Sequence, residues 1–395
     1  MKLAARTQSV QPSATLAMTA RAQAMRAAGA DVLGMSAGEP DFVTPAHICA
    51  AAAAAMAAGE TKYTPVAGSA ALRRAVVAYA QTTYGLAVTV PQVMVGTGGK
   101  QILFNAIACL LEPGDEALMA SPYWVSYPDM IRFAGASPVL VAAADGLGGL
   151  PQAADWAQSI GPRTRLIILN SPSNPTGATY TAAELVAIAE LLRLHPDIAI
   201  ISDDIYSGLV YDGRFVGLAQ VAPDLMDRLL IATGVSKSYA MTGWRIGFGI
   251  GPAPLLAAMT DLQGACTSGA CSIAQAAALC ALTGPQEPLD SMRAIFRGRR
   301  DRLVTGLRAL PDVHIELPAG AFYAFPRIDA YLGGKVPDTQ ALCEHLLSQV
   351  GLALVPGAAF GSERHVRLSF ACSDAAIDSG LERFGRGLSL LRGRS

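Results

Sequence analysis

Short runs rich in β-branched and aliphatic residues alternate with longer helical patterns along the first three quarters of the chain. Segments of helix length, such as Lys100–Leu111 and Ala182–Leu194, separate most of these runs. Such alternation is typical of an α/β fold built on a mostly parallel sheet with helices on both faces. The seven predicted strands are Gln92–Val95, Glu116–Met119, Pro138–Val141, Leu166–Leu169, Ile198–Ser202, Leu229–Thr233 and Ile246–Ile250.

The pattern changes after about residue 285. A long predicted helix, about Leu289–Leu310, is followed by short strands and helices that continue to Leu391, which indicates a smaller α+β domain. A helix near Thr15–Ala28, ended by Gly29, is expected to join that domain. We therefore expect a large domain over residues 45–288 and a small domain made of residues 1–44 and 289–395.

Four predicted strands are followed by polar or glycine-rich segments. The segments are GTGGK, NSPSNPTG, DDIY and GVSKSY, and each comes where a strand ends. In a parallel sheet, ligands bind beyond the carboxyl ends of the strands. The four segments can therefore converge on one site.

The composition excludes several classes of protein. Lys+Arg (30) and Asp+Glu (31) nearly cancel, so the 395-residue chain has no basic footprint for nucleic acid. Only 15% of the residues are charged, against about 25% in typical domains, which fits an alanine-rich chain with a large interior and a subunit interface. Seven scattered cysteines without a CxxC pair argue against disulfides and structural zinc, and the five histidines share no metal spacing. No apolar run is long enough for a membrane span and no signal peptide is expected, so we predict a cytoplasmic protein without a metal site.

Each candidate site residue also has an ordinary structural interpretation. The segment 96-GTGGKQ-101 can bind an anion at a helix N-terminus, or it can be a simple strand–helix turn. Asp203 can hold a cationic heterocyclic nitrogen or cap a helix. Lys237 can be a Schiff-base nucleophile or a solvated surface lysine. Arg245 and Arg367 can bind a phosphate and a carboxylate, or form salt bridges within the protein.

A set of motifs in this order and spacing is far more specific than any single one. The motifs are 37-AGEPDF-42, 62-KYTP-65, 98-GGKQ-101, 121-SPYWVSYP-128, 171-SPSNPTG-177, 203-DDIY-206, 236-SKSYAMTGWRIG-247, 355-VPG-357 and 366-VRLSF-370. With them the chain resembles, over nearly its whole length, the class I aminotransferases among the fold-type I pyridoxal-phosphate enzymes. It is most similar to the bacterial aspartate aminotransferases whose phosphate loop reads GGK.

The resemblance implies a role for each matching residue toward pyridoxal 5'-phosphate. Lys237 would bind the cofactor covalently and move the proton of the substrate Cα. Asp203 would keep the pyridine nitrogen protonated, Tyr206 and Asn174 would hydrogen-bond the ring oxygen, and Trp124 would stack on the ring. The phosphate would be held by Gly98, Gly99, Lys100, Ser236 and Arg245, and by Tyr63 of a second subunit. A homodimer with shared active sites is therefore implied.

The resemblance also implies where a substrate binds. Arg367 would clamp the α-carboxylate, with Gly38, Asn174 and Trp124 nearby. The segment 263-QGACTSGACSIAQ-275 lacks the arginine that grips the distal carboxylate in the animal and enteric branch. Lys100, helped by a hydroxyl of Ser13 or Thr15, is expected to take that role, which favours an acidic substrate such as L-aspartate. The resemblance implies reversible amino transfer between this substrate and 2-oxoglutarate by a ping-pong mechanism.

Three alternatives stay open at this point. Relatives of the GGK subgroup also accept prephenate or aromatic amino acids. A pyridoxal-phosphate carbon–sulfur β-lyase shares the fold and most of these residues. A non-catalytic regulatory relative would usually carry an added DNA-binding domain, for which there is no room before Ala37.

Overall fold

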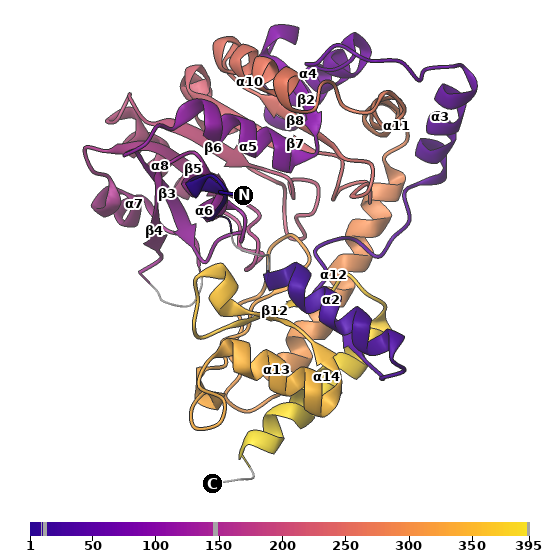
Figure 1. Cartoon of the computed structure of the whole chain (residues 1–395), viewed down its shortest axis with the longest axis vertical. Coiled ribbons are helices and arrows are strands. Elements are labelled where there is room, and N and C mark those ends of the chain that lie inside the picture. Colours follow the sequence, from indigo (N-terminus) through magenta and orange to yellow (C-terminus); the bar gives the residue numbers. More distant parts are fainter. Residues whose placement is uncertain (9, 11–13, 145–148, 393–395) are drawn as a thin grey trace.

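The computed structural model describes residues 1–8, 10, 14–144 and 149–392, and it is organised around a central sheet (Figure 1). Within the described residues this sheet has seven strands in the order β2-β8-β7-β6-β5-β3-β4. Only β8 runs antiparallel to its neighbours. The strands are β2 (Val93–Thr97), β3 (Glu116–Ser121), β4 (Ser137–Ala142), β5 (Thr164–Asn170), β6 (Ala199–Asp203), β7 (Leu229–Gly234) and β8 (Ile246–Ile250).

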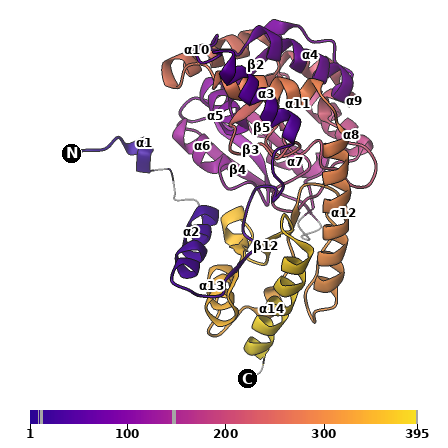
Figure 2. The same cartoon turned by 90° about the vertical axis from the view of Figure 1, so that its right-hand side faces the viewer.

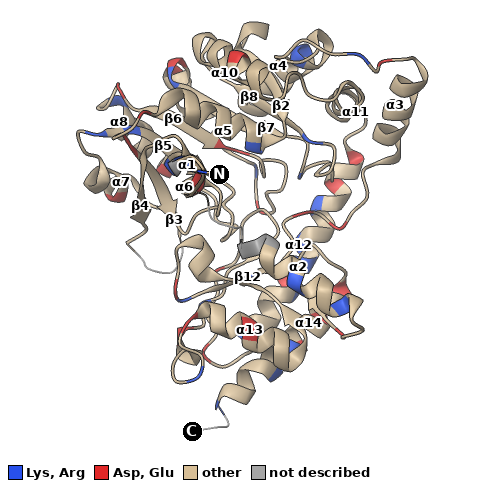
Figure 3. Cartoon of the chain, viewed as in Figure 1, with Lys and Arg blue, Asp and Glu red and all other residues tan. Residues whose placement is uncertain are grey.

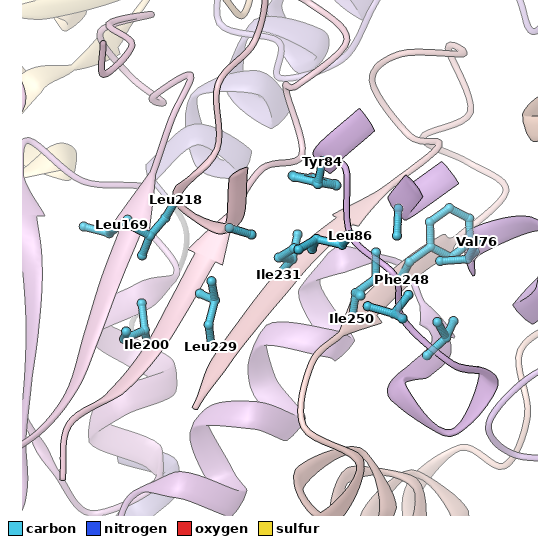
Figure 4. Close-up of a cluster of buried hydrophobic side chains, with 14 of the residues drawn as sticks. Val76, Tyr84, Leu86, Leu169, Ile200, Leu218, Leu229, Ile231, Phe248 and Ile250 are labelled. Carbon is cyan, nitrogen blue, oxygen red and sulfur yellow. The ribbon is translucent and has the colours of Figure 1, made fainter. Parts of the chain in front are cut away.

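Helices cover both faces of this sheet, because successive side chains of a strand point to opposite faces. Leu166 and Ile168 of β5 pack into a cluster with helices α5 (Gly99–Leu110), α6 (Tyr127–Phe133) and α10 (Ala253–Cys266). Ile167 and Leu169 face the other side, where a larger cluster forms (Figure 4). The helices on that side are α3 (Ala46–Ala57), α4 (Ala70–Tyr84), α7 (Ala153–Ser159), α8 (Ala182–Arg193), α9 (Leu218–Val221) and α11 (Ser272–Thr283). The predicted α/β fold with a mostly parallel sheet is confirmed.

A second set of elements lies below the sheet in the view of Figure 1. Its three-stranded antiparallel sheet has the order β11-β12-β9, and β1 pairs in parallel with β10. The elements are α2 (Ala14–Ala27), β1 (Leu33–Gly34), α12 (Glu287–Arg308), β9 (Tyr323–Ala324), α13 (Thr339–Val350), β10 (Leu352–Ala353), β11 (Val355–Pro356), β12 (Val366–Ser369) and α14 (Asp374–Arg392). The remaining short elements are η3 (Asp329–Tyr331) and η4 (Gly357–Phe360), which lie in the same region, and α1 (Ala5–Gln8), η1 (Val90–Gln92) and η2 (Pro223–Asp227), which lie outside it.

The N-terminal and C-terminal parts of the chain share one hydrophobic core in this lower region. Met18 and Ala22 of α2 are buried in the same cluster as Phe296 of α12 and Leu346 of α13. Figure 2 shows α12 running from the level of the large sheet down into this region, with α2 on the opposite side. Charged residues are sparse on the central sheet and frequent along α12 (Figure 3). Within the described residues, no helix is both long enough and apolar enough to cross a membrane.

Candidate active site

A cavity of about 490 Å³ opens where several strands of the large sheet end. Asn170 ends β5, Asp203 ends β6, and Lys237 follows β7 within three residues. Eleven of the residues predicted from the sequence line this cavity together: Gly38, Gly99, Lys100, Trp124, Asn174, Asp203, Tyr206, Ser236, Lys237, Arg245 and Arg367. Two do not: Gly98 precedes the first turn of α5, and Tyr63 lies at the surface with its side chain 97% exposed.

Lys237 is a half-buried amine inside the cavity. Its Nζ donates a hydrogen bond to the carbonyl oxygen of Gly38 at 2.5 Å. Burial lowers the pKa of Lys237 to about 8; the nearby guanidinium groups of Arg367 and Arg245 act in the same direction, and Glu39 opposes them. A larger fraction of the amine is therefore neutral near pH 7 than for a solvated lysine, and the neutral amine is the nucleophile.

Asp203 places a buried carboxyl group opposite this amine. Its Oδ2 accepts a hydrogen bond from the Tyr127 hydroxyl at 2.6 Å, and its Oδ1 accepts one from the backbone N–H of Ile205 at 3.3 Å. Burial raises the pKa of Asp203 to about 6, while these two hydrogen bonds and the charge of Lys237 oppose the rise. A carboxylate held in this way is suited to a cationic partner in the cavity, because an unpaired buried charge is costly.

Gly98, Gly99 and Arg245 form a cradle for an anion. Gly98 precedes α5 with φ of 83°, and a Cβ at this position would lie 2.5 Å from Nη2 of Arg245. The Arg245 guanidinium donates to the carbonyl oxygen of Thr242 at 2.9 Å and has no ion pair within the described residues. Ser236 lines the same cavity. Donors of this kind at the N-terminus of a twelve-residue helix suit a phosphate group.

Arg367 is a second guanidinium without a carboxylate partner, and it is only 2% exposed. Its Nη1 donates to Asn174 Oδ1 and its Nη2 donates to the carbonyl oxygen of Ser36, both at 2.9 Å. Nε has no hydrogen-bond partner within the described part of the chain, and no ion pair is formed there either. The guanidinium lies 4.4 Å from the ring centre of Tyr323. Because the acid partner that a salt bridge needs is not found among the described residues, the geometry favours a carboxylate ligand.

Lys100 lies beside Trp124 in the cavity wall. Its Nζ is 4.9 Å from the Trp124 ring centre and donates a hydrogen bond to Ser126 Oγ at 3.1 Å. Partial burial and then the charge of Arg245 lower the pKa of Lys100. Ser13 and the side chain of Thr15, the hydroxyls expected near this amine, lie outside the described residues.

Several side chains of the site were not predicted from the sequence. Asn170 accepts from the backbone N–H of Asn174 and donates to the carbonyl oxygen of Asp203, both at 2.9 Å, so it ties two strand ends together. The Tyr206 and Tyr323 hydroxyls are 2.8 Å apart. The residues missed are Thr19, Glu39, Ser126, Tyr127, Asn170 and Tyr323. Asn170 and Tyr127 stand inside motifs that drew attention to the site, whereas Tyr323 lies in an apolar stretch that gave no signal.

Comparison with known proteins agrees with this geometry. Residues 30–384 match the family described as aminotransferase class I and II, and the chain belongs to this family. An aspartate/prephenate aminotransferase of Cereibacter sphaeroides is 48% identical over 390 residues, which cover 96% of this chain and 98% of that protein. An aspartate aminotransferase of Geobacillus stearothermophilus is 44% identical, with 98% of each chain covered. The predicted family is confirmed, and the chain is an aminotransferase enzyme.

Solved structures extend the comparison to the fold. The aspartate aminotransferase of Rhizobium meliloti superimposes with a TM-score of 0.93 at 42% identity, covering 98% of this chain and 99% of that one. The aspartate aminotransferase of Thermus thermophilus, solved with maleate, superimposes with a TM-score of 0.92 at 41% identity, covering 98% of this chain and 100% of that one. These neighbours confirm the expected fold type I.

Proposed function

We propose that this chain is a pyridoxal-phosphate-dependent aminotransferase that moves an amino group reversibly between L-aspartate and 2-oxoglutarate. One observation carries the proposal: Lys237, Asp203 and two guanidinium groups that have no acid partner among the described residues face the same cavity. The names of the relatives support both the reaction and the acidic substrate.

The residues of the cavity fit pyridoxal phosphate at each of its polar ends. Gly99, Ser236 and Arg245, with Gly98 and the Lys100 backbone, would hold the phosphate, since no described acid competes for Arg245. Asp203 would hold the ring nitrogen, and Tyr206 and Asn174 the ring oxygen, with Trp124 against the ring. The bound cofactor accepts the amino group and spreads the negative charge that develops at the substrate Cα.

The chain's own side chains would bind and orient the cofactor and would move the proton of the substrate Cα. The amine of Lys237 would attach the cofactor and, when released, accept the proton of the substrate Cα, for which its lowered pKa is suited. Asp203 would keep the ring nitrogen charged from its buried position in the cavity wall. The hydrogen bond from Tyr127 would hold the Asp203 carboxylate in place.

Two cationic side chains would select a dicarboxylate. Arg367 would bind the α-carboxylate, with Gly38 and Asn174 beside it, and Lys100 would reach the distal carboxylate. The name of the 48% identical relative also supports prephenate as an alternative acceptor, which carries two carboxylates as well. A carbon–sulfur β-lyase is the less favoured alternative, because none of the reported relatives is named as one.

We further propose that two chains share each active site. Tyr63 is 97% exposed in the single chain, yet its motif implies a phosphate contact, which a second chain would provide. The division into a large domain of residues 45–288 and a small domain of residues 1–44 and 289–395 is proposed with it. The separate hydrophobic clusters around the large sheet and around α12 support that division.

The function is tested by the absorption of the purified yellow protein when single amino acids are added without a keto acid. L-Aspartate and L-glutamate should convert the cofactor to its amino form quickly, and alanine or tyrosine slowly. Lys237→Ala should abolish turnover and covalent cofactor, whereas Lys335→Ala, at an exposed lysine, should change neither. Pyruvate and ammonia released from a sulfur amino acid would instead identify a β-lyase.

A further inference from the structure

Two buried tyrosines meet inside the site through their hydroxyl groups. Tyr206 follows β6 and Tyr323 belongs to β9, so the pair joins the large sheet to the three-stranded sheet. The oxygens are 2.8 Å apart, and the rings meet edge to face at 5.9 Å between centres. Both side chains line the cavity and are at most 3% exposed. This contact therefore lies away from bulk water, where the position of each proton matters.

Each hydroxyl can donate one hydrogen bond, so the direction of the shared bond decides which proton is left for the cavity. Within the described residues neither hydroxyl has another hydrogen-bond partner. If Tyr206 donated to Tyr323, the hydroxyl proton of Tyr206 would be taken up by this hydrogen bond and could not reach a ligand. If Tyr323 donates, the proton of Tyr206 is free to point toward a ligand.

The charge around the pair favours Tyr323 as the donor. The Arg367 guanidinium lies 4.4 Å from the Tyr323 ring centre, and a cation over the ring makes the phenol a stronger donor. Burial raises the pKa of both phenols and Arg367 lowers both, but for Tyr323 Arg367 ranks directly after burial, whereas for Tyr206 it ranks after two pKa-raising effects of Tyr323. The shared hydrogen bond lowers the pKa of Tyr323 and raises that of Tyr206, so Tyr323 is the more acidic phenol of the pair. Glu39 acts on Tyr323 and Asp203 on Tyr206, and both raise the pKa of the phenol concerned. The Lys237 amine also faces the Tyr206 ring, but at 5.9 Å from the ring centre it is farther away than Arg367 is from Tyr323.

We propose that Tyr323 is a positioning residue for the transamination: its hydroxyl donates to Tyr206 and thereby directs the Tyr206 proton at the ring oxygen of the bound cofactor. The inference rests on the proposed function, which gives Tyr206 its acceptor. It adds that the ring of Tyr323 supports the Arg367 clamp while its hydroxyl orients Tyr206. One side chain thus contacts both the substrate-binding and the cofactor-binding parts of the site.

The test is a spectrophotometric pH titration of the holoenzyme, read from the absorption change when the linkage between Lys237 and the cofactor gains a proton. A hydrogen bond to the ring oxygen stabilises its anionic form, so losing that bond favours protonation. Tyr206→Phe should raise the midpoint by about one pH unit or more, and Tyr323→Phe by about half a unit. Because Tyr323 acts through Tyr206, the double variant should shift no further than Tyr206→Phe alone.

Matched controls separate this role from packing. Tyr323→Phe keeps the ring against Arg367, so the affinity for a dicarboxylate such as maleate should change by less than about twofold. Tyr331→Phe removes a hydroxyl that donates to the carbonyl oxygen of Pro311, and it should not move the midpoint. An unchanged midpoint in Tyr323→Phe, additive shifts, or a large loss of maleate affinity would overturn the inference. A wild-type protein that binds no pyridoxal phosphate would overturn the proposed function itself.

Discussion

The Arg367 guanidinium donates a hydrogen bond to the side-chain oxygen of Asn174 at 2.9 Å, although the two residues are 193 positions apart in the chain. The contact joins β12 to the loop that follows β5, and it lies at the wall of the cavity. Asn174 is neutral, so it orients the guanidinium without cancelling its charge. The charge stays available for an anion that enters the site.

Replacing Arg367 by Gln should therefore weaken dicarboxylate binding more than it weakens the fold. We expect the dissociation constant of maleate for the holoenzyme to rise by at least about 100-fold, or about 3 kcal/mol, as for other buried charge contacts. Isothermal titration calorimetry measures this directly. Arg364→Gln, at an exposed arginine three residues earlier, is the control and should bind normally. Equal affinities in the two variants would mean that Arg367 has only a structural role.

Lys100 should control the choice of substrate rather than the chemistry. Lys100→Met keeps the backbone amides at the start of α5 but removes the amine beside Trp124. We expect kcat/KM for aspartate to fall about tenfold or more, while the value for alanine changes little, because alanine has no distal carboxylate. Stopped-flow half-reactions with each amino acid measure the ratio. A loss shared equally by both substrates would contradict this role.

The fold and much of the site follow from local sequence patterns. The strand at Leu166–Leu169 could be predicted because it is a run of four consecutive apolar residues. Such a run occurs here because these side chains are buried on both faces of the sheet. Lys237 and Asp203 stood out because polar residues after buried strands gather at one edge of a parallel sheet. Strand limits differ by a few residues; Gln92, for example, ends η1 and β2 begins at Val93.

What the sequence pattern did not reveal depends on contacts between distant segments. Tyr323 sits among apolar residues in GAFYAFP and looks like part of an ordinary strand. Its function in the site depends on Tyr206, 117 positions earlier, and on Arg367, which stacks on its ring. Local patterns carry no information about such pairs. Glu39, which accepts a hydrogen bond from the Thr242 hydroxyl at 2.8 Å, was overlooked for the same reason.

Asp203 should make the apo-protein less stable as the pH rises. Its pKa is raised from 3.8 to about 6, so the folded state holds the proton more tightly than the unfolded chain does. The contribution of Asp203 to the free energy of unfolding therefore falls as the pH rises from about 4 to about 6, and it stays at its lower value above that range. Asp203→Asn should raise the unfolding free energy of the apo-protein at pH 8 by on the order of 3 kcal/mol, with no gain near pH 3.

Urea unfolding of the apo-protein at the two pH values measures this difference. Asp261→Asn, at an exposed carboxylate, is the control and should change stability little at either pH. Asp203→Asn should also abolish most transamination, since a neutral amide cannot pair with a charged ring nitrogen. A variant that is equally destabilised at both pH values would show that packing, and not charge, dominates at this position.

Gly247 of β8 keeps the anion cradle open. A Cβ at this position would collide with the backbone of Gly98 and Gly99, which cannot move without shifting the start of α5. Gly247→Ala should therefore raise the dissociation constant of pyridoxal phosphate at least tenfold and lower the melting temperature. Gly249→Ala is the control on the same strand, because its Cβ would only approach side chains at 3.3 Å or more. Equal cofactor affinity in both variants would exclude this steric role.

Tyr63 should act on the active site of the partner chain. Tyr63 is 97% exposed and does not line the cavity of its own chain. A contact between Tyr63 and a cofactor would therefore be made with the cofactor in the cavity of a second copy. Tyr63→Ala should weaken pyridoxal phosphate binding, and its activity should be low when the cofactor is limiting. Lys237→Ala should be inactive at any cofactor concentration. Analytical ultracentrifugation of the wild-type chain should show a dimer.

Mixing the two variants gives a sharper outcome than either alone. After subunit exchange, half of the dimers should be hybrids, and each hybrid should have one site with both Lys237 and a partner's intact Tyr63. Activity at limiting cofactor should therefore rise to about one quarter of the wild-type value. If the mixture shows only the averaged activity of its two parents, Tyr63 does not complete the site of a second chain. The shared-site proposal would then fail, while the roles of Lys237 and Asp203 within one chain would be unaffected.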